Sequence, residues 1–131
     1  MTQEEKELLL KDLCARLPYN VIVDPIDCGK AILIGIKDRK LLLFDTVHKK
    51  EYDKSWDIEY VKPYLRPMSS MTEEEYTNLW ISCTWLWFDN DLGTVIHGDY
   101  KCYDWLNAHH FDYRGLIEKG LALEAPKGMY K

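Results

Sequence analysis

The stretch KAILIGIKDRKLLLFDT, residues 30–46, decides the fold, because it holds two apolar runs of strand length around one short polar turn. The pattern predicts strands over Lys30 to Lys37 and over Lys40 to Thr46, joined as an antiparallel hairpin across Asp38-Arg39. Gly35 interrupts the first run, and a lone glycine inside a strand indicates a bulge or a close backbone approach.

Further strands are expected on both sides of this turn. The run Leu41 to Phe44 is continuous rather than alternating, which predicts a largely buried strand. Val21 to Val23 and Thr94 to His97 are short strand candidates, and the alternation over Trp56 to Tyr60 predicts a strand with one packed face. Two prolines within Val61 to Met68 predict an extended exit without a regular ladder, because proline donates no backbone hydrogen bond.

Capping-box sequences predict two helix starts, since a threonine hydroxyl and a glutamate carboxylate three residues later can satisfy free backbone N–H groups. The first, Thr2 to Glu5, precedes leucines at helical spacing, and Pro18 is expected to end that helix. The second, Thr72 to Glu75, predicts a central helix from about Glu73 to Trp85. The inner face of this helix is predicted to carry Tyr76, Leu79, Trp80, Cys83 and Trp87.

The C-terminal part is expected to hold two short helices, one over about Tyr103 to His110 and one from Asp112 as N-cap to Lys119. The fold class that follows is α+β: a small antiparallel sheet, which could close toward a barrel, with an N-terminal helix, a central helix and two short C-terminal helices. The chain has 131 residues, of which 47% are hydrophobic, so one domain over residues 1–131 is expected.

Composition narrows the possible function classes. The net charge of −5 gives no broad electropositive surface, so nucleic-acid binding is not favoured. Basic residues gather in residues 30–54, but acidic residues alternate with them, and nucleic-acid binding there ranks third. No signal peptide or spanning segment is recognisable, which predicts a cytoplasmic protein without membrane contact. Four cysteines without a CxxC pair are expected to be reduced and partly buried: Cys14, Cys28, Cys83 and Cys102.

The densest group of residues capable of chemistry lies between His97 and Asp112, and a small enzyme or metal-binding protein is the alternative function. The alternative metal ligands are His97, Asp99 and His109, whose side chains suit a transition metal. Their spacing is poor for this purpose, because His109 and His110 are adjacent and would diverge by about 100° on a helix.

A Cys–His nucleophilic pair would need Cys102 beside His97 or His109, yet no local signature surrounds this cysteine. The sequence also contains no phosphate loop, no dinucleotide glycine pattern and no HExxH. We therefore assign no catalytic residue, no metal and no cofactor, and the sequence favours binding over catalysis.

Aromatic residues give the strongest binding signal, since they make up 13% of the chain. Trp85 lies off the predicted inner face of the central helix, which makes it a candidate for an exposed anchor. Tyr64, Trp85 and Trp105 are the predicted binding residues, and their ligand is expected to be an unidentified protein partner. The leading function is therefore a protein-interaction module.

Three segments carry a resemblance to a family. They are EKELLLKDLCARLPY (5–19), VKPYLRPMSSMTEEE (61–75) and DWLNAHHFDYRGLIEKGLA (104–122). They resemble segments of short uncharacterised proteins encoded by phages and integrated mobile elements of intestinal anaerobic bacteria. The resemblance covers under half of the chain and implies an accessory protein of a mobile element. It supplies no activity, so no catalytic residue is carried over from it.

Overall fold

The central hairpin forms as the sequence predicts. In the computed structural model, which describes residues 1–26, 29–89 and 95–130, β2 (Ala31–Lys37) pairs antiparallel with β3 (Lys40–Asp45). Asp38 and Arg39 form the turn with φ of 51° and 65°, the left-handed backbone that suits the twist of a two-residue hairpin. The register shifts between Leu33 and Gly35, so the glycine marks a bulge.

One mostly antiparallel sheet of seven strands is built around this hairpin. Its remaining strands are β1 (Ile22–Pro25), β4 (Lys50–Glu51), β5 (Val61–Pro67), β8 (Phe111–Asp112) and β9 (Leu123–Glu124). The order is β4-β3-β2-β1-β5-β8, and β9 also pairs with β5. The α+β class is confirmed, but the described strands form no closed barrel, because the chain leaves the sheet along β5 instead of returning to β4.

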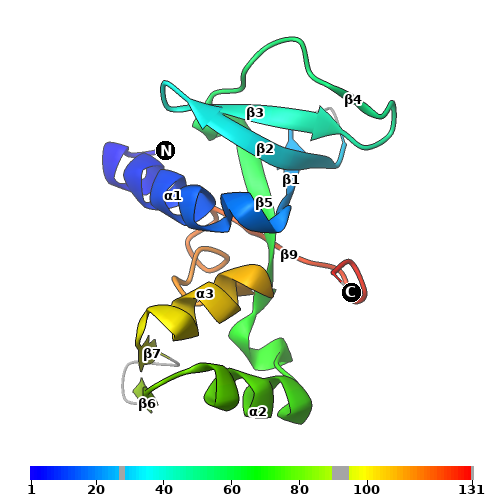
Figure 1. The fold of residues 1–131 in the computed structure, drawn as a ribbon. Coiled ribbons are helices and arrows are strands. Elements are labelled where there is room, and N and C mark those ends of the chain that lie inside the picture. The colour runs from blue at the N-terminus through cyan, green and yellow to red at the C-terminus, as the bar shows by residue number, and fades with distance from the viewer. Residues whose placement is uncertain (27–28, 90–94, 131) are drawn as a thin grey trace.

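The described residues form three α-helices, which are α1 (Gln3–Arg16), α2 (Glu73–Ser82) and α3 (Tyr100–Ala108). Helix α1 packs against the sheet, and the other two lie beyond it (Figure 1). Figure 1 shows α1 beneath the sheet, α3 in the middle and α2 at the opposite end, with β5 running from the sheet toward α2. A separate two-stranded sheet of β6 (Leu86–Asp89) and β7 (Val95–Gly98) lies at the α2 end.

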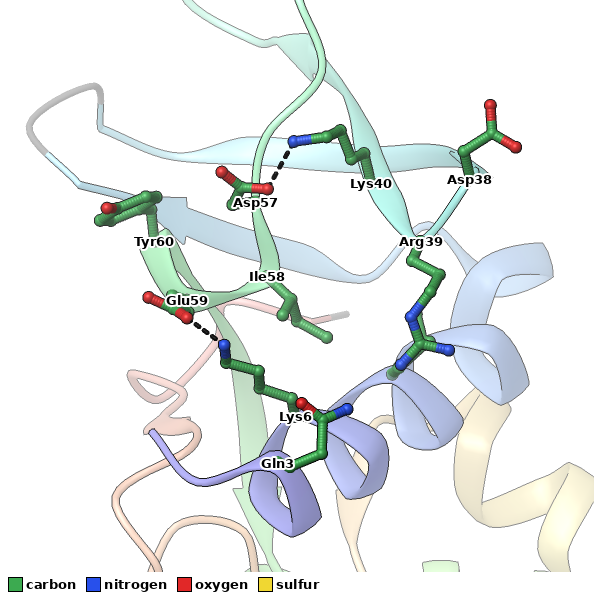
Figure 2. A pocket seen from close by; sticks show the side chains of 10 residues that line it. Gln3, Lys6, Asp38, Arg39, Lys40, Asp57, Ile58, Glu59 and Tyr60 are labelled. Carbon is green, nitrogen blue, oxygen red and sulfur yellow. Dashed lines mark hydrogen bonds and ion pairs between the residues drawn. The ribbon is translucent and has the colours of Figure 1, made fainter.

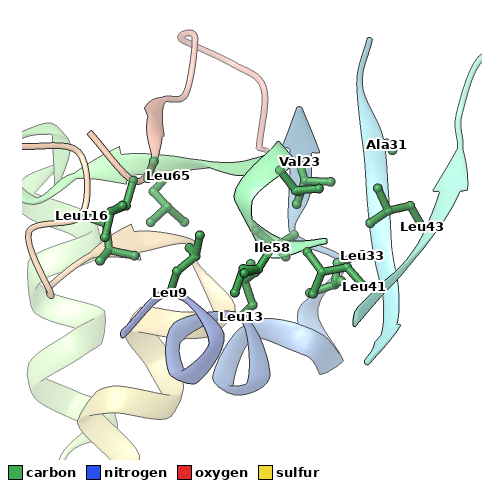
Figure 3. Close-up of a cluster of buried hydrophobic side chains, with 14 residues drawn as sticks. Leu9, Leu13, Val23, Ala31, Leu33, Leu41, Leu43, Ile58, Leu65 and Leu116 are labelled. Carbon is green, nitrogen blue, oxygen red and sulfur yellow. The ribbon is translucent and has the colours of Figure 1, made fainter. Parts of the chain in front are cut away.

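The buried apolar side chains form two clusters along this axis. The first, the sheet core, lies between α1 and the sheet (Figure 3). It includes Leu9, Leu13, Leu33, Leu41, Leu65 and Leu116. The second, the helical core, lies among α2, α3 and the small hairpin, and it consists of Leu79, Leu86, Ile96, Cys102, Leu106 and Phe111. The α2 end of the molecule is therefore a packed structure in its own right.

A buried ion network fastens α1 to the segment between the two cores. The Asp12 carboxylate accepts from Arg16 Nε at 2.8 Å and from Arg114 Nη1 at 2.8 Å. Arg16 Nη2 donates to the carbonyl of Phe111 at 2.7 Å. Asp12 and Arg16 are both fully buried. The network joins α1 to residues 111–114 through two fully buried groups, Asp12 and Arg16, and the mostly buried Arg114.

The segment Val61 to Met68 corrects one expectation. It was expected to lack a regular ladder, but β5 is a central strand that pairs antiparallel with β1 and parallel with β8 and β9. Prolines remove only their own donors, and the neighbouring groups still pair: the N–H of Arg66 donates to the carbonyl of His110 at 2.8 Å. Tyr130 completes this region, since its hydroxyl accepts from the N–H of Ile22 and donates to the carbonyl of Tyr64.

Other expectations also need correction. The segment expected as a strand over Trp56 to Tyr60 is a single bridge followed by a 3₁₀ turn, Ile58–Tyr60. β3 is not largely buried throughout, because Leu42 is exposed between two buried leucines. The helix expected from Asp112 to Lys119 is a series of turns, in which the Asp112 carboxylate accepts from the N–H groups of Leu116 and Ile117.

Helix α2 begins as the capping box predicts and ends early. Thr72 Oγ1 accepts from the N–H of Glu75 at 3.1 Å, and the Glu75 carboxylate accepts from the N–H of Thr72 at 3.1 Å. The helix ends at Ser82 rather than Trp85, and α3 begins at Tyr100, three residues before the expected start. Because α2 ends early, neither Trp85 nor Trp87 belongs to it. Trp85 precedes β6, and Trp87 lies within β6.

Candidate protein-interaction surface

The small hairpin has one inner and one outer face. Leu86 and Ile96 are buried on the inner face, with Phe88 packed against the helical core. On the outer face Trp87 stands opposite His97 in the register, and their rings stack with centroids 4.1 Å apart. Trp87 is still 50% exposed, because its other ring face is not covered. Strand alternation therefore divides the aromatic residues of β6 between core and surface.

The face of α2 expected to be buried is largely exposed. Leu79 is the buried residue of this helix, whereas Tyr76 is 41% and Trp80 44% exposed. The Tyr76 ring lies edge-on to Trp80 with centroids 6.1 Å apart and stacks on Phe88 at 5.5 Å. Among the described residues, α2 buries only Leu79, and helical periodicity alone does not reveal which of its other side chains are covered.

Exposed apolar side chains thus occur on α2, just before β6 and on β6 itself. We call this set the aromatic surface: Tyr76, Trp80, Ile81, Trp85 and Trp87. Ile81 is 77% exposed and Trp85 52%. Large indole rings in contact with water are unusual outside binding sites, because each exposes apolar area that folding normally buries.

Helix α3 supports the aromatic surface from beneath. The Asp99 carboxylate caps α3 by accepting from the N–H of Cys102 at 3.3 Å, and it also accepts from the N–H of Thr84 at 3.2 Å. Gly98 permits close packing, since a Cβ there would lie 2.6 Å from the Cys102 side chain. These contacts fix the connection between α2 and β6, so the exposed tryptophans stand on a rigid base.

The three predicted binding residues lie at different places. Trp85 belongs to the aromatic surface. Trp105 lies on α3, half-buried, and stacks on His109 at 4.1 Å and on Phe111 at 5.8 Å. Tyr64 is half-buried on β5, far from α2, with Lys30 over its ring at 5.9 Å. The sequence pattern predicted Trp80 and Trp87 on the buried face of the central helix. Their exposure is therefore the feature that the sequence did not reveal.

The alternative metal ligands are not brought together. His97 stacks on Trp87, Asp99 caps α3, and His109 stacks on Trp105. Within residues 1–26, 29–89 and 95–130, no three His, Cys, Asp or Glu side chains form a group that could hold a metal ion. Each of the three side chains instead has a structural neighbour that accounts for its position.

The cysteines of the described residues are free thiols. Cys102 is buried, and burial raises the pKa of its thiol to about 12, with a further contribution from the neighbouring Cys83. A thiol with that pKa carries almost no thiolate at neutral pH and is a poor nucleophile. Cys14 is exposed rather than partly buried, and Cys28 lies outside the described residues.

Two cavities lie away from the aromatic surface. One, of about 350 Å³, lies between α1, the β2–β3 turn and the 3₁₀ turn before β5 (Figure 2). Its lining includes the ion pairs Lys6–Glu59 and Lys40–Asp57, in which charges neutralise each other. The other, of about 490 Å³, lies beside the C-terminal segment. There Arg66 binds Glu75 through two hydrogen bonds of 2.6 and 2.7 Å.

The basic residues of the 30–54 segment are partly neutralised as well. Arg39 pairs with Glu7, and Lys40 pairs with Asp57 at 2.5 Å. Lys30 lies over the ring of Tyr64. Paired cations attract phosphates weakly, so this segment offers a poor surface for nucleic acid.

Comparison with protein-family models, with curated proteins and with solved structures finds no match for this chain. No helix of the described residues has both the length and the apolar character needed to cross a membrane.

A variant pair tests whether α2 is a support for exposed rings. Thr72→Ala is expected to lower the free energy of unfolding by about 1 kcal/mol through loss of the cap. Trp80→Ala is expected to cost about 1–2 kcal/mol, rather than the 3–5 kcal/mol of a fully buried ring, because Trp80 is already 44% exposed. Urea unfolding gives both values. Thr77→Ala is the control, since its exposed hydroxyl bonds only to a carbonyl of its own helix.

Proposed function

We propose that this chain is a protein-interaction module that binds its partner through the aromatic surface. The observation that carries the proposal is the exposure of three tryptophans, Trp80, Trp85 and Trp87, on adjoining elements above a packed core. Tryptophan is enriched among the residues that dominate binding energy at protein interfaces, because its ring buries a large area with few rotatable bonds.

The resemblance to proteins of phages and integrated mobile elements gives this binding a context. An accessory protein of such an element, acting in the cytoplasm of a bacterial host, would bind a protein of the host or of the element. The scattered positions of His97, Asp99 and His109 give the enzyme and metal alternatives no comparable support.

A capture experiment with matched variants tests the proposal. The immobilised protein is incubated with bacterial lysate, with and without phage infection, and the bound proteins are identified by mass spectrometry. Trp80→Ala combined with Trp87→Ala is expected to abolish the capture of a specific protein. Val47→Ala combined with Tyr60→Ala is the control, because both residues are exposed apolar side chains near the sheet. Equal capture by both double variants would refute the aromatic surface as the binding site.

A further inference from the structure

The acidic charge of the chain is concentrated in the segment of sequence that carries the aromatic surface. Residues 69–108 hold seven acidic residues and one basic residue, Lys101, which gives this segment a net charge of −6. The whole chain carries −5, so the rest of the molecule is close to neutral. The same segment contains four of the five tryptophans: Trp80, Trp85, Trp87 and Trp105. Negative charge and most of the tryptophans thus belong to the same segment of the chain.

Two of these acids are exposed on the helix that carries Trp80. Glu73 and Glu74 lie in the first turn of α2, and neither forms a salt bridge with any described residue. Glu73 and Trp80 are seven residues apart, two helical turns, so they lie on the same side of α2. Glu75 differs, since Arg66 neutralises it and lowers the pKa of its carboxyl to about 2.

We infer that the aromatic surface binds a segment of a partner protein that is rich in arginine and lysine; this inference rests on the proposed function. Cations bind to the faces of indole rings, which carry negative electrostatic potential. The carboxylates of Glu73 and Glu74 would attract the same cations, and the net charge of this end would steer a basic segment toward the rings. An arginine side chain suits both features, because its planar guanidinium stacks on an indole while pairing with a carboxylate.

Charge also decides against a second copy of this chain as the occupant. Two aromatic surfaces placed face to face would bring together two segments that each carry −6. Like charges across an interface oppose association, so the surface remains available to a basic partner.

Two labelled peptides of about ten residues test the inference, one alternating arginine with leucine and one with glutamate in place of arginine. Binding to the full chain is measured by fluorescence anisotropy at several salt concentrations. The arginine peptide is expected to bind at least about tenfold more tightly than the glutamate peptide, and its affinity should fall as salt rises. Trp80→Ala should lower the affinity for the arginine peptide, since the Trp80 ring supplies the face on which the guanidinium stacks.

Matched charge variants sharpen the test. Glu73→Gln combined with Glu74→Gln leaves the capping box intact. This double variant is expected to lower the affinity for the arginine peptide about fivefold and to reduce the salt dependence of that affinity. Glu51→Gln combined with Asp53→Asn changes the net charge equally at the opposite end of the molecule, near β4 in Figure 1, and should leave the affinity unchanged.

The outcomes separate the two proposals. If both peptides bind equally, or neither binds, while lysate capture still depends on Trp80 and Trp87, the basic partner is wrong and the interaction module stands. If lysate capture does not depend on these tryptophans, the interaction module itself is wrong. Dimerisation that requires the tryptophans, measured by sedimentation equilibrium, would overturn the basic partner in favour of a second copy.

Discussion

Asp12→Ala is expected to lower the free energy of unfolding by about 3–5 kcal/mol, which would leave little of the stability of a domain of this size. The reason is that Asp12 holds the fully buried guanidinium of Arg16 through two hydrogen bonds, of 2.8 and 3.1 Å. Without the carboxylate, this cation retains the carbonyl of Phe111 as its partner but loses its counter-charge. Urea unfolding at neutral pH measures the loss.

A double variant distinguishes an unpaired charge from a simple loss of packing. Asp12→Leu combined with Arg16→Met removes both charges while keeping apolar volume, and it should be clearly more stable than Asp12→Ala alone. Arg114→Met removes only the partner that is partly exposed, at 17%, and is expected to cost less than either. A loss below about 1 kcal/mol for Asp12→Ala would show that water reaches Arg16, and that the network does not hold α1 to residues 111–114.

Stability is expected to decline as the pH falls from about 7 to 4, and His110 should cause most of the decline. Its ring is buried, stacks on Tyr130 at 3.7 Å, and leaves Nδ1 without a partner among the described residues. Burial, followed by the nearby cations of Arg16, His109 and Arg66, lowers the pKa of His110 from 6.5 to about 4. The native state therefore holds this histidine neutral at a pH where the unfolded chain protonates it.

The direction in which stability changes with pH follows from proton linkage. Between pH 6.5 and 4 the unfolded state binds more protons at His110, so stability rises with pH in this window and is lost on acidification. The loss amounts to about 2 kcal/mol at pH 5 and about 3 kcal/mol once the pH is below 4. Glu75 does not contribute to the decline in stability between pH 7 and about 4.5. Its lowered pKa affects stability only as the pH falls below about 4.5.

His110→Asn tests the assignment, since asparagine tolerates the left-handed backbone of this position, where φ is 65°. The variant is expected to start less stable, because the stack on Tyr130 is lost, but to change little between pH 7 and 5. His109→Asn is the control: partial burial also lowers the pKa of His109, but this residue is far more exposed than His110, and most of the decline should persist. A decline of unchanged size in His110→Asn would show that another group is responsible.

Asp12 and His110 together explain why the aromatic surface can be exposed without loss of the fold. The α2 end has its own core, and the Asp12 network and the buried His110 join that core to α1 and the sheet. Trp80 and Trp87 on α2 and β6 are half-exposed and lie outside both cores, so their substitution should affect partner binding more than stability. This separation makes the binding experiments interpretable.

The sequence alone determined the local elements. Thr72 and Glu75 mark the start of α2, because a capping box depends only on residues three apart. Asp38-Arg39 between two apolar runs predicted the hairpin, since a two-residue turn leaves the strands one way to pair. The lone strand glycine, Gly35, likewise marked the bulge. In each case the determining contacts lie within a few residues along the chain.

Only the tertiary structure decided which of these elements are covered. Periodicity gives Leu79 and Trp80 the same apolar character, yet one is buried and the other exposed, because α2 has α3 on one side and no described element on the other. Asp12 and Arg16 lie one turn apart on α1, and their burial depends on Phe111 and Arg114, which are nearly a hundred residues away in the sequence. Burial depends on what packs against a residue, and that is set by distant parts of the chain, so local pattern cannot fix it.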